Sequence, residues 1–180
     1  MPLTEDGVTI ALELLNSWDE LVDPPELLRD AETLRRWLSS HGFDAGSITE
    51  EDVPKARELR ARLTAPFDAR NEAEAVDLLN DLLAELGTPP RLERSSVGWR
   101  LRCWPGEDGL RAVGALGAFA LLEAIRDLGW ERFGRCEGAP CRCLYVDRSR
   151  NRSRRYCCRL CADRIAQARH RSRKRSAATP

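Results

Sequence analysis

The chain has 180 residues, of which 42% are hydrophobic and five are tryptophan, so it can bury a core and general disorder is excluded. Its 29 basic and 29 acidic residues balance, but residues 136–180 hold 13 basic against three acidic residues, whereas residues 1–135 hold 16 against 26. An acidic body therefore precedes a basic end that suits a polyanion, and nucleic acid is the commonest one.

Apolar residues recur at three- and four-residue steps in four segments, which predicts four amphipathic helices. Prolines and glycines separate these segments, and Thr49 with Asp52 and Asn71 with Glu74 are typical of helix caps. The predicted helices span about residues 8–18, 27–41, 52–63 and 74–86.

The pattern then changes to a predicted β-hairpin near residues 91–104, in which Ser95-Ser96-Val97-Gly98 forms the turn. A long helix follows over about residues 110–128. It is apolar almost all round, so we expect it at the centre of the core. Its longest apolar run, residues 112–122, is too short to span a bilayer, which needs about 20 residues. The start MPLTEDGVTI lacks the features of a signal peptide. We therefore expect a cytoplasmic protein with no membrane partner.

Six of the seven cysteines lie in the last quarter of the chain, in two groups about 15 residues apart. In a reducing compartment such a cluster favours metal ligands over disulfides. Cys136-x4-Cys141 fits a zinc knuckle, and either Cys157 or Cys158 can join Cys161, with the spacing of Cys158 slightly the better. Four thiolates leave no open coordination position. We therefore expect one structural Zn²⁺, which replaces the hydrophobic core that this polar segment lacks.

Arginine-rich segments surround the cysteines, one between the two groups and one in a predicted helix after Cys161. The planar guanidinium donates two parallel hydrogen bonds to phosphate, and a zinc-braced basic helix is a familiar way to reach a DNA groove. An acidic protein surface is an alternative partner, and arginines of the loop can instead bond carbonyls. The candidate nucleic-acid contacts are Arg148, Arg150, Arg152, Arg154, Arg155, Arg169, Arg171, Arg173 and Lys174.

The stretch RCEGAPCRCLYVDRSRNRSRRYCCRLCADRIAQARHRSRKR resembles the CGNR zinc finger family. The family carries a Cys-x4-Cys knuckle, then an aromatic-Cys pair and a Cys-Gly-Asn-Arg sequence before a basic helix. The resemblance implies that the zinc ligands are Cys136, Cys141, Cys157 and Cys161, because Cys157 directly follows an aromatic residue. Residues 161–164 read Cys-Ala-Asp-Arg here, so an acidic side chain replaces the Asn and would weaken a contact to phosphate.

The elements ahead of the finger look like the ABATE-type domain of stress-induced transcription regulators, with ALELLNSWDEL, a Leu-Trp-Leu helix, ARELRARL, a hairpin and an apolar helix in that order. The resemblance implies a zinc-dependent DNA-binding transcription regulator whose N-terminal domain senses a small-molecule ligand or forms a homodimer. We expect a mainly α fold with a small β-hairpin (α+β). The domains are a helical domain over residues 1–130 and a small four-cysteine zinc finger with a basic helix over residues 131–175, followed by a frayed tail over residues 176–180.

Rival functions are weaker. The chain contains no Gly-rich phosphate loop, HExxH motif or serine-nucleophile elbow, so we expect no enzymatic activity. Cys143 and Cys158 sit beside predicted ligands among arginines that favour thiolates, so a redox sensor that releases zinc on oxidation is an alternative. An RNA-binding or protein-interaction module is another, but Tyr145 and Tyr156 are few aromatics for base stacking, and DNA is favoured.

Two polar features of the helical domain have simple explanations. His41 at a predicted helix end suits the capping of carbonyls. Asn16 and Asp19 interrupt an apolar helix face, and a surface or capping role fits them better than a pocket.

Overall fold

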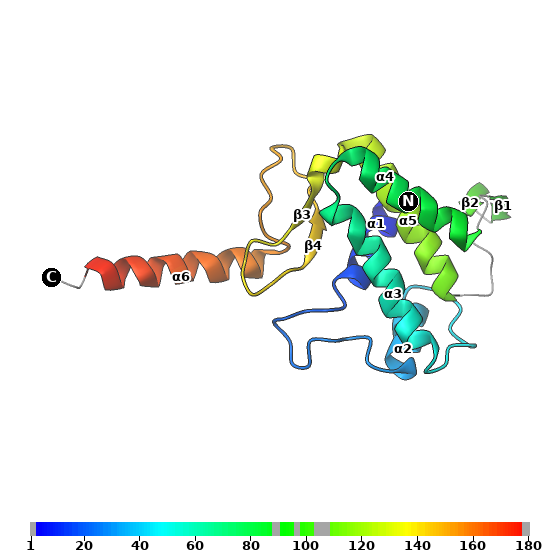
Figure 1. Ribbon diagram of the computed structural model, residues 1–180, viewed down its shortest axis with the longest axis horizontal. Helices are drawn as coiled ribbons and strands as arrows, with labels where there is room; N and C mark the ends of the chain where they lie inside the picture. The colour runs from blue at the N-terminus through cyan, green and yellow to red at the C-terminus, as the bar shows by residue number, and fades with distance from the viewer. Residues whose placement is uncertain (1–2, 88–90, 96–97, 103–108, 178–180) are drawn as a thin grey trace.

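The computed structural model describes residues 3–87, 91–95, 98–102 and 109–177, and it is mainly helical with a small hairpin (Figure 1). The predicted fold class is thereby confirmed. The α-helices are α1 (Leu3–Leu15), α2 (Ala31–Ser40), α3 (Asp52–Thr64), α4 (Glu72–Leu86), α5 (Gly109–Leu128) and α6 (Arg159–Ala177). The 3-10 helices are η1 (Ala65–Asp68) and η2 (Trp130–Arg132), and the strands are β1 (Arg91–Ser95), β2 (Gly98–Arg102), β3 (Phe133–Arg135) and β4 (Leu144–Val146).

Helix α5 is the centre of the helical body, by which we mean residues 3–128. It packs against both α1 and α4, and every residue from Ala112 to Ala118 is buried. Glycines let the helices approach α5 closely. A Cβ at Gly114 would lie 2.9 Å from Leu59 Cδ1, and a Cβ at Gly7 would lie 2.8 Å from Ala120 Cβ. The prediction that the long apolar helix forms the core is therefore confirmed.

Side-chain caps start two of the helices. Asp30 caps α2 in a capping box, and the Asn71 side chain accepts a hydrogen bond at the start of α4, as predicted. The predicted cap of α3 is different. The Asp52 carboxylate does accept hydrogen bonds from Thr49, but α3 begins at Asp52 and not directly after Thr49, and its N-cap residue Glu51 makes no side-chain capping bond.

His41 closes the end of α2. Its Nδ1 lies 2.8 Å from the Trp37 carbonyl oxygen, and its Nε2 lies 2.7 Å from a carboxylate oxygen of Glu13 on α1. The expected capping role is confirmed, and the same ring also joins two helices.

Two antiparallel strand pairs complete the fold. β1 pairs with β2 at the position predicted for the hairpin, although β2 ends at Arg102 and residues 103 and 104 lie outside the described residues. β3 pairs with β4, with Gly134 opposite Tyr145. The second pair was not predicted, because three-residue strands are too short to show a two-residue alternation. The clustered aromatic and β-branched residues of Leu144–Val146 were its one signal.

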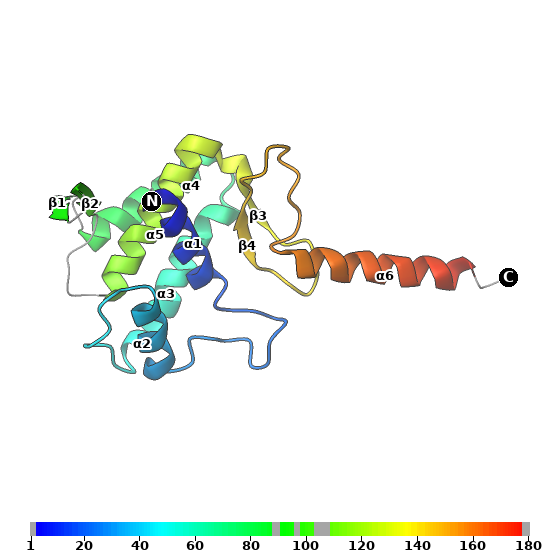
Figure 2. The same cartoon turned by 180° about the vertical axis from the view of Figure 1, so that it is seen from behind.

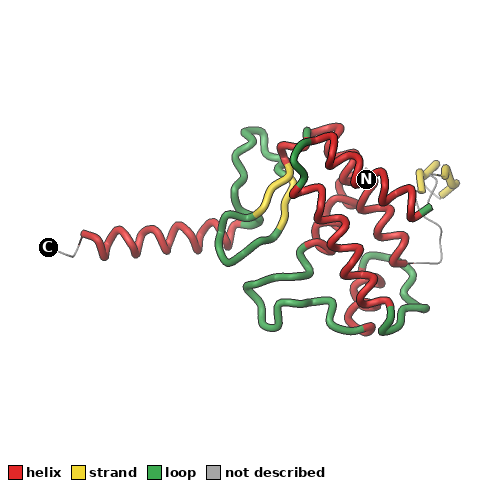
Figure 3. The backbone as a smooth tube through the Cα atoms, viewed as in Figure 1, coloured by secondary structure: helices red, strands yellow, loops and turns green. Residues whose placement is uncertain are grey.

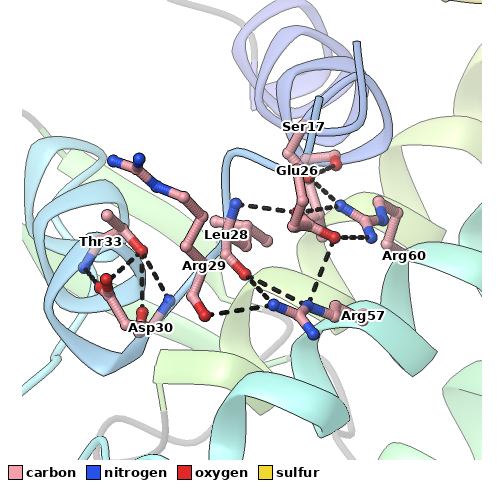
Figure 4. A network of polar contacts seen from close by, with 9 residues as sticks. Ser17, Glu26, Leu28, Arg29, Asp30, Thr33, Arg57 and Arg60 are labelled. Carbon is pink, nitrogen blue, oxygen red and sulfur yellow. Dashed lines mark hydrogen bonds and ion pairs between the residues drawn. The ribbon is translucent and has the colours of Figure 1, made fainter. Parts of the chain in front are cut away.

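The loop between α1 and α2 is held on α3 by a polar network (Figure 4). Arg60 donates to Ser17 Oγ at 2.7 Å and to both carboxylate oxygens of Glu26 at 2.9 and 2.6 Å. Arg57 donates to the Leu28 carbonyl oxygen at 2.8 Å. Burial acts to raise the pKa of Glu26, but the hydrogen bonds from Arg60 and the Leu28 N–H outweigh it and hold that pKa below its ordinary value. The same loop exposes four large apolar side chains: Trp18, Leu21, Val22 and Leu27.

Helix α6 stands apart from the rest of the molecule. It begins beside β3 and β4 and extends away from the helical body as a single rod, at the opposite end from the β1–β2 hairpin (Figures 1 and 2). The loops around its first turn are visible in Figure 3. No described helix has the length and apolar character needed to cross a bilayer.

Candidate metal centre and basic helix

Tight turns position the first pair of cysteines. β3 leads into Cys136, whose N–H donates to the Cys143 carbonyl oxygen at 2.9 Å and so extends the strand pairing by one step. The Cys141 N–H then donates to the Gly138 carbonyl oxygen at 3.0 Å, which folds the chain back on itself. Cys136 and Cys141 are buried, and their thiols come to the same side of the knuckle.

Four thiols meet at one point. The Sγ atoms of Cys136, Cys141, Cys157 and Cys161 all lie within 4.8 Å of one another. Cys141 Sγ is 3.7 Å from Cys157 Sγ, which is 3.8 Å from Cys161 Sγ. Zn–S bonds of about 2.3 Å in a tetrahedron place the sulfurs about 3.8 Å apart, so the cluster fits one zinc ion. With four thiolates the site is closed, and zinc braces the fold there.

Protonation opposes metal binding at these thiols. Burial raises the pKa of Cys161 to about 12, and burial also raises the pKa of Cys157. Zinc must therefore displace protons when it binds, and its apparent affinity rises with pH.

The two remaining finger cysteines lie outside the four-thiol cluster. Cys158 is exposed, so the structure groups Cys157 with the other three thiols and not Cys158. A hydrogen bond from the Cys161 backbone lowers the pKa of Cys158. Cys143 is half-buried and packs against the cluster, and burial raises its pKa to about 12. The two residues therefore differ, because only Cys158 is both accessible and inclined to ionise.

Arg164, which sequence reasoning did not single out, is built into the metal centre. Its Nη2 donates to the Gly138 carbonyl oxygen and lies 3.9 Å from Cys161 Sγ, while its Nε is buried without a partner. The guanidinium therefore ties α6 to the first knuckle and places a positive charge beside the thiolates. The signal was present in the family motif, in which an arginine ends the sequence that begins with the last cysteine.

A buried carboxylate organises the arginine-rich loop between the two cysteine groups. Asp147 accepts hydrogen bonds from the N–H groups of Ser149 at 2.8 Å and Arg154 at 3.0 Å. Burial acts to raise the pKa of Asp147, but the bonds from Ser149 and Arg154 outweigh it and lower that pKa. Tyr145 adds a bond from its hydroxyl to the Arg154 carbonyl oxygen at 2.6 Å. The loop is therefore a defined structure and not a flexible linker.

Arg152, Arg154 and Arg155, which are among the predicted DNA contacts, bond to other groups of the protein. Arg154 donates to the carbonyl oxygens of Tyr156, at 3.1 Å, and of Cys157. Its guanidinium also lies over the Tyr145 ring. Arg152 pairs with Glu131 at 2.9 Å, and Arg155 pairs with Glu137. Arg154 thus supports the segment that carries Cys157, and the other two join exposed carboxylates.

The other predicted contacts face solvent. Arg148 and Arg150 lie exposed near the tip of the loop. On α6, every side chain from Ala166 to Lys174 is exposed, which includes Arg169, Arg171 and Arg173. The structure therefore separates the four-cysteine metal centre from the exposed basic part of α6.

The finger, residues 132–174, is joined to the helical body at β4. Asn16, just after α1, donates from Nδ2 to the Leu144 carbonyl oxygen at 3.0 Å and accepts the Leu144 N–H at 2.7 Å. Leu144 and Val146 belong to the same buried cluster as the helices. Sequence reasoning expected a surface or capping role for Asn16 and missed this long-range clamp. Its signal was an amide that interrupts an apolar helix face.

Comparison with known families agrees with this geometry. Residues 9–128 match the ABATE family, described as "Putative stress-induced transcription regulator", and residues 132–174 match the CGNR zinc finger. No curated protein matches the chain. The four-thiol cluster lies within the second match, and the first covers two thirds of the sequence. The chain therefore belongs to the ABATE family, and it carries a CGNR zinc finger at its basic end.

Proposed function

We propose that this protein is a zinc-dependent transcription regulator that binds DNA through α6 and the loop ahead of it, while the helical body senses a ligand or forms a homodimer. The observation that carries the proposal is the anchoring of α6. Cys161 fixes its first turn to the metal centre, and the exposed basic side chains that follow begin at Arg169, about two turns further along the helix. A rigidly anchored basic helix is the kind of element that enters a DNA groove.

The exposed charges favour phosphate as the first contact. Arg169, Arg171, Arg173 and Lys174 lie within two turns of one helix, and no side chain of the described protein buries them. An exposed helix of like charges is destabilised by its own repulsion, and a polyanion would relieve it. Arg148 and Arg150 offer further contacts from the loop. Arg152, Arg154 and Arg155 would need to release internal partners first, so they are weaker candidates than the exposed residues of α6.

The proposal assigns the chain no catalytic role, and a closed four-thiolate site has no coordination position for a substrate at the metal. It places the protein in the cytoplasm, where the six unpaired thiols of the finger would stay reduced.

The first experiment is a selection of genomic DNA fragments on the full-length, zinc-loaded protein at about 150 mM salt, where specific complexes survive and weak phosphate binding is suppressed. Enrichment of a shared sequence supports a site-specific regulator. Retention without enrichment shows a non-specific phosphate binder. No retention overturns the DNA proposal and favours RNA or an acidic protein as the partner.

A matched pair of variants tests the contact assignment. Arg171→Gln on α6 should weaken binding about equally for all sequences and reduce the slope of log K against log salt by about 1, because one phosphate contact is lost. Arg36→Gln removes an exposed arginine of α2 and should leave the slope unchanged. Equal slopes for Arg171→Gln and wild type would contradict phosphate binding by this residue.

A second candidate function is a thiol-redox sensor, favoured by the exposed, acidified Cys158 next to a cluster cysteine. A peroxide would oxidise two thiols to one disulfide and be reduced to water, and the loss of a ligand thiolate would release zinc. Zinc release under mild peroxide should then be slower in a Cys143→Ser/Cys158→Ser double variant than in wild type. Equal release from both proteins would exclude the sensor.

A further inference from the structure

A groove of about 330 Å³ lies where the helical body meets the finger. Its walls come from the end of α1 and the following loop, from α3, and from the β3–β4 region of the finger. A hollow of this size at a boundary between two units is where small molecules commonly bind. The residues that matter for its chemistry are Leu15, Trp18, Arg60, Arg135, Arg142 and Leu144.

Three arginines and one carboxylate are among the residues that line the groove. Two of its three arginines are held in place, Arg60 by the Glu26 carboxylate and Arg135 by Asp68, with Nε to Oδ1 at 2.8 Å. Within the described residues, the Arg142 guanidinium has neither a hydrogen bond nor an ion pair. Glu20 is the one carboxylate among the described residues that line the groove, and because Glu26 and Asp68 offset the charges of Arg60 and Arg135, Arg142 is the lining arginine that no bonded carboxylate offsets.

The groove also has apolar lining residues. Leu15 and Leu144 are two of them, and both are buried. The Trp18 side chain lines the groove yet is 48% exposed. A large exposed aromatic residue beside a hollow is an informative departure from normal burial, and tryptophan is enriched where proteins bind partners.

We propose that this junction groove binds a small organic anion, a carboxylate carried on a flat apolar body. The apolar part would pack against Trp18, Leu15 and Leu144, and the carboxylate would accept hydrogen bonds from Arg142, the lining arginine without a bonded carboxylate. Because helical body and finger both supply walls, the ligand would stabilise one arrangement of the two regions relative to others. This last step rests on the proposed DNA-binding function, whereas the binding site itself does not.

Binding is measured without DNA, on the full-length zinc-loaded protein, by calorimetry and by tryptophan fluorescence. The probe is phenylacetate, and its neutral isostere phenylacetamide is the matched control ligand. We expect saturable binding of phenylacetate and at least about tenfold weaker binding of phenylacetamide, the loss expected for one charge-assisted bond. The proposal would be overturned if phenylacetate showed no saturable binding at concentrations up to about 10 mM. Equal binding of phenylacetate and phenylacetamide would also overturn it.

Two variants locate the site. Arg142→Gln removes an exposed side chain that bonds no other described residue, so it should keep the zinc content and helicity of wild type while it weakens phenylacetate binding about tenfold. Arg36→Gln on α2 should bind as wild type does. Equal affinity of all three proteins for phenylacetate would place the ligand elsewhere and overturn the assignment. If the protein retains DNA but does not bind the anion, the proposal for the groove is wrong and the proposed function stands. If it binds the anion but retains no DNA, the proposed function is wrong and the proposal for the groove stands.

Discussion

The helical body and the finger are stabilised by different interactions. Fully buried leucines such as Leu14, Leu34 and Leu121 fill the body, and their burial is worth about 1.5–3 kcal/mol each before the cost of ordering the chain. In the finger, apart from the strand pair that packs on the body, the buried groups are three cluster cysteines and the Asp147 carboxylate. The comparison teaches that the body folds by excluding water, whereas the outer finger depends on a metal ion and a few directed bonds. The two regions should therefore fail under different treatments.

Loss of zinc should have the largest effect. Four-thiolate zinc binding contributes about 10–16 kcal/mol in small zinc domains, far more than the outer finger gains from burial. Chelation or Cys161→Ser should abolish hydrogen-exchange protection in residues 136–143 and from residue 147 to the first turns of α6, and leave α5 protected. Cys158→Ser is the control, because that thiol is outside the cluster and one zinc per chain should remain. If Cys158→Ser lost zinc as Cys157→Ser does, the ligand assignment would be wrong.

A cavity in the body should have the next largest effect. Leu121→Ala removes a fully buried side chain from α5 and should cost about 2–5 kcal/mol of unfolding free energy in urea. Leu78→Ala on the more exposed side of α4 should cost much less. The zinc content of folded Leu121→Ala should equal that of wild type. Zinc loss in that variant before the body unfolds would show that the two regions are not separable.

Removal of the Asn16 hydrogen bonds to Leu144 should have a smaller effect on stability, and it tests whether the two regions are coupled. Asn16→Ala leaves the Leu144 N–H and carbonyl oxygen without their partner, at a cost of about 1–3 kcal/mol. It should also reduce the loss of body stability that follows chelation, because the finger is then less firmly attached. The control is Asn80→Ala on the exposed face of α4. Identical responses of wild type and Asn16→Ala to chelation would show that the clamp carries no coupling.

The smallest expected effect is on the pH dependence of stability, through Glu26. The pKa of Glu26 is lower in the folded chain than its ordinary value of 4.5, so its contribution to stability is present above that value and is lost as the pH falls through the folded pKa. Glu26→Gln should therefore lower stability at neutral pH and flatten its decline in acid, as read from urea unfolding at several pH values. Glu32→Gln, in an exposed ion pair with Arg36, should change the profile little. Parallel acid profiles for Glu26→Gln and wild type would contradict this.

Local pattern was sufficient to predict most of the fold and the metal cluster. The helices follow from apolar periodicity, and spacing indicates Cys136, Cys141 and Cys161. Spacing alone slightly favoured Cys158 as the fourth ligand, and the choice of Cys157 came from the resemblance to the CGNR zinc finger. Long-range features could not be predicted in this way. The Asn16 bond to Leu144 joins residues 128 positions apart, and no periodicity encodes it. The inward direction of Arg154 depends on a loop shape set by Asp147, and in sequence that arginine resembles its exposed neighbours. The domain boundary near residue 130 stays a prediction.

The exposed half of α6 has an evolutionary consequence. Beyond Ile165 its side chains are exposed as far as Lys174, so substitutions there would alter neither the core nor the zinc ligands. Selection on those positions would come from the partner alone. Members of this family should therefore diverge fastest in this half-helix as they acquire new targets, while Arg164 and the four cysteines stay the same.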